Sequence, residues 1–183
     1  ASFNKKIFIP VILLLAGSTF LPMVQERILN TVEFTRDGVE VREESSLGWR
    51  MQKWEYLWNA GLKKPFAGHG LGASGTFGND TLGAHNDYLR YFVETGFLGT
   101  FLYFFPYFYL FFDALKKRPF FEKGSLVKKL ADFFIVFIPA FLIMSISENL
   151  ASYVTVHWYL WCLVGIYLSL KMTDTRTEEV KLA

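Results

Sequence analysis

Four apolar runs divide this chain into segments of membrane-spanning length. They cover residues 7–24, 97–115, 130–147 and 154–170. A helix rises about 1.5 Å per residue, so runs of this length cross most of a roughly 30 Å hydrocarbon layer. The chain is also 52% hydrophobic and 19% aromatic, which is not typical of a soluble domain. The sequence therefore predicts an all-α, polytopic bundle of four transmembrane helices.

Basic residues predict how these helices are oriented. Lys5 and Lys6 precede the first run, and the most basic short loop covers residues 116–129. Short loops rich in Lys and Arg stay on the cytoplasmic side of a membrane. The expected organisation is a transmembrane helix over 1–24, an outer loop over 25–96, three transmembrane helices over 97–170, and a cytoplasmic tail over 171–183.

The composition argues against several other classes of protein. The formal net charge is only +2, and no basic stripe interleaved with aromatic residues suggests nucleic acid. Cys162 is the only cysteine, so no internal disulfide can form. No pair of His, Cys, Asp or Glu has zinc-like spacing with a third ligand in view. We therefore expect neither a metal site nor a nucleic-acid partner.

The large outer loop contains a predicted interfacial helix over residues 51–60. Arg50, Trp54 and Trp58 recur at helical spacing there, and tryptophans beside charged residues are typical of a helix lying in the headgroup region. Earlier in the loop, the residues around Val39 and Val41 can form a short strand.

Glycines dominate the next part of the loop, residues 63–83. No strand precedes them and no Gly-Lys-Ser/Thr follows, which argues against a nucleotide-binding loop. Two interpretations stay open. The glycines either permit close backbone packing, or their N–H groups form a nest around a phosphate.

Polar residues gather just before the second apolar run, in the segment 84–99. Asn86 or Asp87 can cap a short helix, and Gly96 suits the left-handed position at its end. His85 then lies at the helix N-terminus, where the helix dipole favours a neutral imidazole that can act as a base. A structural role for His85 is the alternative.

Two other histidines are weaker candidates for chemistry. His157 lies beside Trp158 and Tyr159, where an anchor at the membrane interface is the default role. His69 lies inside the glycine-rich segment. No nucleophile-elbow pattern accompanies any of them.

Three motifs in this order are similar to those of the O-antigen ligase and polymerase family of bacterial membrane glycosyltransferases. They are Arg-x-x-x-Trp at 50–54, a Pro-x-x-Gly-x-Gly-x-Gly at 65–72, and His-Asn-x-Tyr-Leu at 85–89 with Glu-x-Gly-x-x-Gly at 94–99. The resemblance covers about residues 46–170, and it indicates the C-terminal portion of a longer polytopic protein whose N-terminal helices would complete the site.

This resemblance implies transfer of a glycan from an undecaprenyl diphosphate carrier on the outer, periplasmic face of the bacterial inner membrane. The acceptor is lipid A–core in a ligase of lipopolysaccharide biosynthesis, or a growing carrier-linked glycan in a polymerase. No metal, nucleotide or other cofactor is implied, because the energy is stored in the glycosyl diphosphate.

The chemistry of such a transfer suggests roles for the motif residues. An attacking sugar hydroxyl needs a general base, for which His85 is the candidate. The departing diphosphate needs a cation, and Arg50 offers a bidentate guanidinium. The candidates for substrate binding are cations that assist Arg50 and polar groups that orient His85 or its helix: Arg90, Lys63, Lys64, Asn86 and Glu94.

Two other classes of function stay open from the sequence. A transporter or channel subunit would have ionisable residues near mid-membrane, and the runs offer few beyond Asp113 and Asp132 near their inner ends. A non-catalytic anchor or assembly subunit is the other alternative.

Overall fold

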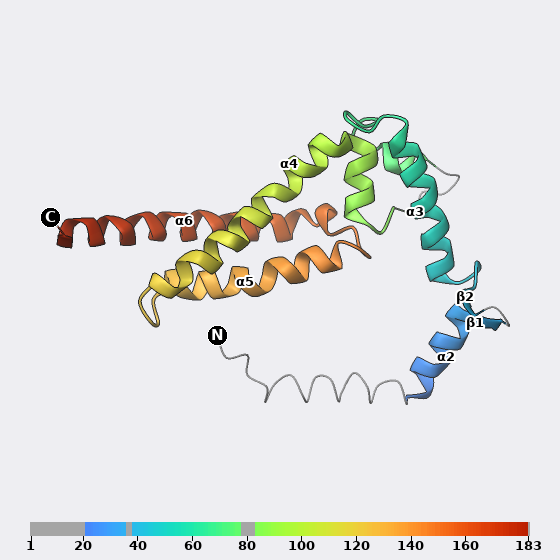
Figure 1. Cartoon of the computed structure of the whole chain (residues 1–183), viewed down its shortest axis with the longest axis horizontal. Helices are drawn as coiled ribbons and strands as arrows, with labels where there is room; N and C mark the ends of the chain where they lie inside the picture. The colour runs from blue at the N-terminus through green and yellow to red at the C-terminus, as the bar shows by residue number, and fades with distance from the viewer. Residues whose placement is uncertain (1–20, 36–37, 78–82, 183) are drawn as a thin grey trace. The chain divides into compact units, whose positions relative to one another are not determined.

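The computed structural model describes residues 21–35, 38–77 and 83–182. They fall into two compact units, Ala1–Lys53 and Trp54–Ala183, each of which is described by itself. Most of the described residues are helical (Figure 1). The predicted helical class is therefore confirmed for this part of the chain.

A helix and a small hairpin make up much of the first unit. Helix α2 covers Pro22–Thr31, and strands β1 (Val32–Thr35) and β2 (Gly38–Val41) pair antiparallel. The strand expected around Val39 and Val41 is confirmed, whereas the sequence analysis does not predict β1. Because of this hairpin, the fold is mostly helical rather than all-α.

Helix α3 covers Ser46–Leu62, so it begins before the predicted helix over 51–60. The side-chain oxygen of Ser45 accepts the N–H of Gly48 at 3.0 Å. A serine in this position satisfies a free backbone donor of the first helical turn, which stabilises an early start.

Three long helices of the second unit pack around one apolar cluster. They are α4 (Asp87–Lys117), α5 (Leu126–Met144) and α6 (Val154–Leu182), and Figure 1 shows them running beside one another. The buried side chains come from all three helices and include Tyr107, Leu110 and Ala114, then Phe134, Ile138 and Phe141, and then Leu160, Val164 and Tyr167. Short 3-10 turns η1 (Ala73–Gly75), η2 (Arg118–Phe120) and η3 (Leu150–Ser152) complete the elements.

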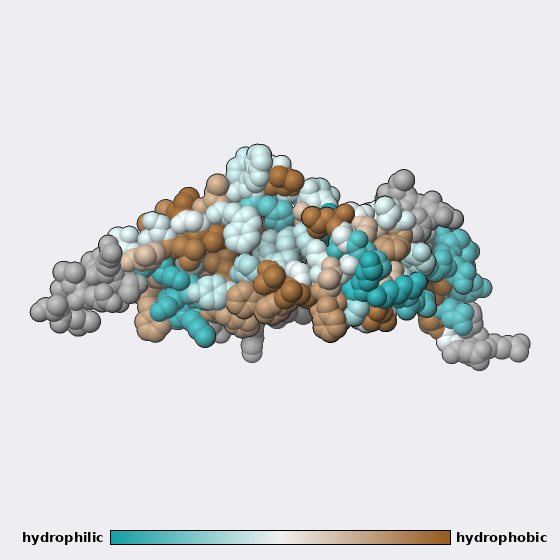
Figure 2. Space-filling view, turned by 90° about the horizontal axis from the view of Figure 1, so that it is seen from above, coloured by the Kyte–Doolittle hydropathy of each residue, from teal (hydrophilic) through white to brown (hydrophobic). Residues whose placement is uncertain are grey.

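Within the described residues, α4 alone is long and apolar enough to cross a membrane. Phe101, Phe105 and Phe112 are among the apolar side chains it exposes, and Figure 2 shows apolar and weakly polar residues over much of the visible surface. The predicted run over 7–24 lies almost entirely outside the described residues. The four-helix transmembrane bundle therefore stays a prediction.

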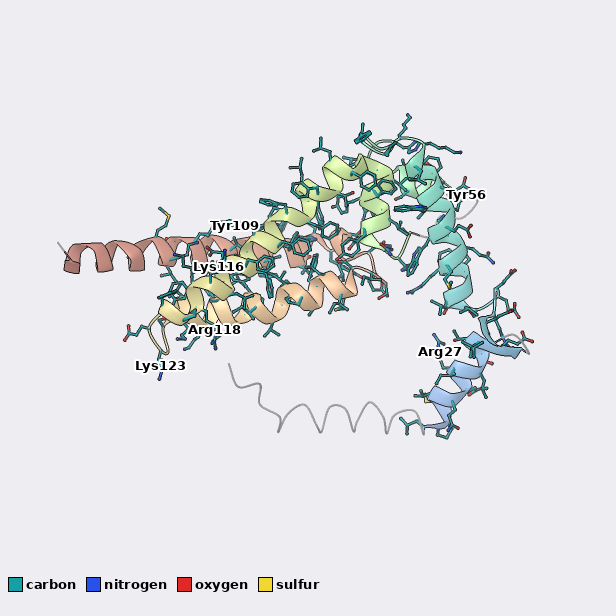
Figure 3. The ribbon with its side chains drawn as sticks, viewed as in Figure 1. Arg27, Tyr56, Tyr109, Lys116, Arg118 and Lys123 are labelled. Atoms are coloured by element: carbon teal, nitrogen blue, oxygen red, sulfur yellow. The ribbon has the colours of Figure 1, made fainter. Side chains whose placement is uncertain are left out.

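The turn between α4 and α5 carries the basic loop that was expected to face the cytoplasm. Lys116, Arg118 and Lys123 lie around this end of the two helices (Figure 3). Arg118 forms an ion pair with Asp132 of α5. Both of these side chains are exposed, so the pair contributes little to stability.

Helix α4 is broken at Gly96, which has φ 69° and ψ −173°. Figure 1 shows a short first segment that turns into a much longer second one. The prediction that Gly96 ends a short helix with a positive φ is therefore confirmed, and the apolar stretch 97–115 follows the break.

The glycine-rich segment 65–72 lies against this break. The N–H groups of His69 and Gly70 donate to the carbonyl oxygens of Val93 and Glu94, at 2.8 and 2.9 Å. These carbonyls end the first segment of α4, so they would otherwise have no partner within the helix. The segment thus supplies backbone donors to an open helix end.

Close approach of two backbones explains the glycines. A Cβ added to Gly68 would lie 2.4 Å from backbone atoms of α4, and one on Gly96 would lie 2.3 Å from backbone atoms of Phe66. The N–H of Phe97 also donates to the Pro65 carbonyl at 2.7 Å. Of the two interpretations of the glycine-rich segment, the contacts favour backbone packing.

We expect Gly68→Ala to destabilise the protein by about 2 kcal/mol or more. The added methyl meets backbone atoms that cannot rotate away, and φ is +68° at this position. Gly165→Ala is the matched control, since nothing lies within 4 Å of its added Cβ. Unfolding temperatures in detergent should drop for Gly68→Ala only. Equal temperatures for the two variants would contradict this account of the break.

Candidate active site

A tight turn precedes α4 and carries the histidine of the His-Asn motif. His85 has φ 46°, which is uncommon for a residue other than glycine. The side chain of Asn86 then accepts the N–H of Leu89 at 3.0 Å. Asn86 is therefore the N-cap of α4, as one of the two predicted alternatives, and His85 lies immediately before it.

Asp87 ties this turn to the connection between α5 and α6. Its N–H donates to the Ser145 carbonyl at 2.9 Å, and its Oδ2 accepts the N–H of Ala151 at 2.9 Å. The side chain is fully buried, and it lies ahead of the Gly96 break and the apolar stretch. Burial raises the pKa of the Asp87 carboxyl, and the hydrogen bond from the Ala151 N–H opposes the rise.

The same connection brings a carboxylate to His85. Oε2 of Glu148 lies 3.7 Å from Nδ1 of His85, and the two side chains are 30% (His85) and 43% (Glu148) exposed. A carboxylate at this distance attracts a positive imidazolium. The ring is thus accessible to a ligand from solvent and has an acidic neighbour on one side.

A pocket of about 240 Å³, lined in part by polar side chains, lies next to this turn. Arg90 and Glu94 come from the first segment of α4, and their Nε and Oε1 atoms are 3.5 Å apart. Ser74 of η1 donates its hydroxyl to the same Oε1 at 2.5 Å, and Arg90 donates to the hydroxyl of Ser152. Asn149 also lines the pocket. The structure therefore brings together the predicted residues Arg90 and Glu94.

The other two histidines contact polar groups within the protein. The Nε2 of His69 is 2.9 Å from the Ala60 carbonyl oxygen, to which only a protonated nitrogen can donate. His157 lies between two tyrosine hydroxyls, with Nδ1 3.2 Å from Tyr107 and Nε2 3.5 Å from Tyr103. Ring nitrogens of both histidines therefore contact polar groups of the protein itself.

The remaining predicted residues lie elsewhere. Arg50 is on the part of α3 that belongs to the first compact unit, so the structure does not relate it to His85. Lys63 and Lys64 are exposed in the turn after α3 and do not line the pocket. Their roles stay predictions.

Sequence reasoning did not select Ser74, Glu148, Asn149 or Ser152. Three of them lie in the connection between α5 and α6, which offered only a polar composition as a signal. Ser74 is one of several small residues in the glycine-rich segment. In the described part of the chain, no three His, Cys, Asp or Glu side chains are grouped so that they could hold a metal ion.

A long apolar helix with a polar site at its head is typical of a membrane-associated helical protein. A family model described as O-antigen ligase matches residues 2–104, which is more than half of the chain. The chain therefore belongs to the O-antigen ligase family, as its motifs predict. Proteins of this family are membrane-associated and act in glycan transfer, with a lipid-linked glycan and an acceptor as substrates. No curated protein and no solved structure matches the chain.

We expect Asp87→Ala to destabilise the turn before α4 by about 1–3 kcal/mol, because the partly buried N–H of Ala151 loses its acceptor. Asp87→Asn should cost less, since its amide oxygen can still accept this hydrogen bond. The measurement is the thermal unfolding of each purified variant in detergent. If the two variants lose equal stability, the negative charge of Asp87 is what matters, and not this hydrogen bond.

Proposed function

We propose that this protein transfers a glycan from an undecaprenyl diphosphate carrier to a sugar hydroxyl of an acceptor, with lipid A–core as the acceptor. The observation that carries the proposal is the partly exposed His85 beside a polar pocket at the head of an apolar helix. Membership of the O-antigen ligase family supports it independently.

The proposed reaction uses His85 as the general base. Its neutral imidazole takes the proton of the acceptor hydroxyl while the oxygen attacks the anomeric carbon of the donor sugar. The bond between this carbon and the diphosphate oxygen breaks, and undecaprenyl diphosphate leaves with the bonding electrons. The proton moves from His85 to water or to the leaving group, so no cofactor is consumed.

Glu148 supports the assignment of His85 as base. A carboxylate 3.7 Å from Nδ1 stabilises the imidazolium that forms when the ring takes a proton. In this proposal Nδ1 carries the hydrogen of the neutral ring on the side of this carboxylate, which leaves the lone pair on Nε2. The nitrogen that would face the acceptor is therefore Nε2.

Arg50 is the proposed partner of the diphosphate. Its guanidinium can bind two oxygens at once, and negative charge accumulates on the diphosphate as the glycosidic bond breaks. Lys63 and Lys64 are exposed cations that we assign to the same diphosphate as weaker contributors. In this proposal, residues 25–96 face the periplasm between transmembrane helices, as the distribution of basic residues predicts.

We expect His85→Ala to lower the rate of glycan transfer by roughly 100-fold or more, since general-base catalysis contributes about this much. The assay uses the protein in membranes with an undecaprenyl diphosphate-linked oligosaccharide and a lipid A–core acceptor, without added metal or nucleotide. His157→Gln is the control, because His157 contacts tyrosines rather than the pocket.

Three results of this assay would change the assignment. Transfer by His85→Ala at the wild-type rate would remove His85 from the role of base. Lengthening of the carrier-linked glycan without labelling of lipid A–core would identify a polymerase of the same family. No transfer by the wild-type protein with either acceptor would favour a non-catalytic membrane subunit.

We expect Arg50→Ala to lower transfer by roughly 100- to 1,000-fold, as for other groups that stabilise a developing negative charge. Arg50→Lys should recover only part of the activity, because an ammonium group cannot bind two oxygens side by side. Arg27→Ala, on an exposed arginine of α2 labelled in Figure 3, is the matched control. Full activity of Arg50→Ala in the same assay would show that another cation serves the diphosphate.

A further inference from the structure

The pocket beside His85 carries two opposite charges, and they neutralise each other. Among the described residues that line it, Arg90 and Glu94 are the only charged ones. Glu94 is 3% exposed and has two partners, the guanidinium at 3.5 Å and the Ser74 hydroxyl at 2.5 Å. Arg90 has a second partner in Ser152. The described lining thus has no net charge.

This arrangement disfavours a phosphate as the ligand. A phosphate that approached Arg90 would also approach the buried carboxylate of Glu94, and the two negative charges would repel each other. It would have to compete with Glu94 for the guanidinium, and displacing Glu94 would leave a buried carboxylate without its cation. The paired charges of this pocket therefore argue against it as the site of the diphosphate.

Neutral residues supply the rest of the described lining, and three of them, Ser74, Asn149 and Ser152, have polar side chains. Ser74 and Ser152 have hydroxyl lone pairs that can accept hydrogen bonds, and the amide of Asn149 can both donate and accept. Gly72, Gly75 and Gly83 leave the backbone uncovered between them. Paired donors and acceptors around a small open cavity are suited to a ligand that itself carries several hydroxyl groups.

The side chain of Asn149 packs closely against Gly83. A Cβ on Gly83 would lie 2.4 Å from Nδ2 of Asn149, so the glycine allows this side chain to approach the turn before His85. Ser152 lies on the same connection, which Asp87 holds through Ala151. The connection between α5 and α6 therefore delivers two polar side chains to one edge of the pocket.

We propose that this pocket binds a neutral sugar unit of the transferred or accepting glycan, and that the diphosphate is bound elsewhere. The inference deepens the proposed function and rests on it for the source of the sugar. It changes the role of Arg90 from an assistant of Arg50 on the diphosphate to a residue that recognises sugar hydroxyls. His85, which lies beside the pocket, would then face a hydroxyl group of the bound sugar.

The test is a pair of binding measurements on the full chain in lipid nanodiscs. One probe is the neutral oligosaccharide released from the lipid-linked donor, detected by saturation-transfer NMR, and the other is inorganic pyrophosphate, detected by phosphorus line broadening. The variants are Asn149→Ala and Ser152→Ala, and the matched control is Ser169→Ala on the exposed surface of α6. Each pocket variant should weaken oligosaccharide binding about 5- to 10-fold, the effect of one lost hydrogen bond. Pyrophosphate binding should be unchanged.

Opposite results would overturn the inference. Weaker pyrophosphate binding with unchanged oligosaccharide binding would make the pocket a phosphate site. Oligosaccharide binding that is absent in the wild-type chain, or equal in all variants, would remove the sugar site. Specific oligosaccharide binding in a protein that transfers no glycan would support the sugar site while rejecting the proposed function, so the two failures are distinguishable.

Discussion

The site depends on backbone hydrogen bonds between the glycine-rich segment and the broken end of α4. The carbonyls of Val93 and Glu94 accept from this segment rather than from later residues of the helix. The apolar stretch can therefore continue in a new direction while these buried carbonyls keep hydrogen-bond donors, whose loss would cost free energy. Without this docking, the first segment of α4 would have no fixed orientation relative to the stretch that follows Gly96.

A second contact joins the turn before α4 to a segment later in the chain. Asp87 accepts from Ala151, and this contact holds the connection between α5 and α6 against the turn before α4. It places Glu148 beside His85 and Ser152 beside Arg90. The core between α4, α5 and α6 is apolar. The polar contacts at the edge of this core therefore define which groups face the pocket.

Local features were predictable because their energetics involve only neighbouring residues. The cap at Asn86 needs an oxygen within one helical turn, and the break at Gly96 needs a residue that tolerates a positive φ. The strand around Val41 follows from β-branched residues. The family was recognisable from motifs that lie within the part of the chain that the family model matches.

The pocket was not predictable, because its walls come from segments far apart in sequence. Ser74 meets Glu94 across the docked glycine-rich segment, and Ser152 meets Arg90 across the connection. No periodicity links such residues, so a sequence shows them only as polar residues in loops. Arg50 is the opposite case. Its motif is recognisable from the sequence, whereas the structure does not place its compact unit relative to His85.

The Arg90–Glu94 ion pair suggests that the proposed reaction binds the diphosphate and the sugar with different groups. The guanidinium of Arg90 is held by the carboxylate of Glu94, which cancels much of the positive charge that would stabilise a leaving diphosphate. A sugar is better oriented by neutral donors and acceptors, which do not attract the diphosphate into the wrong position.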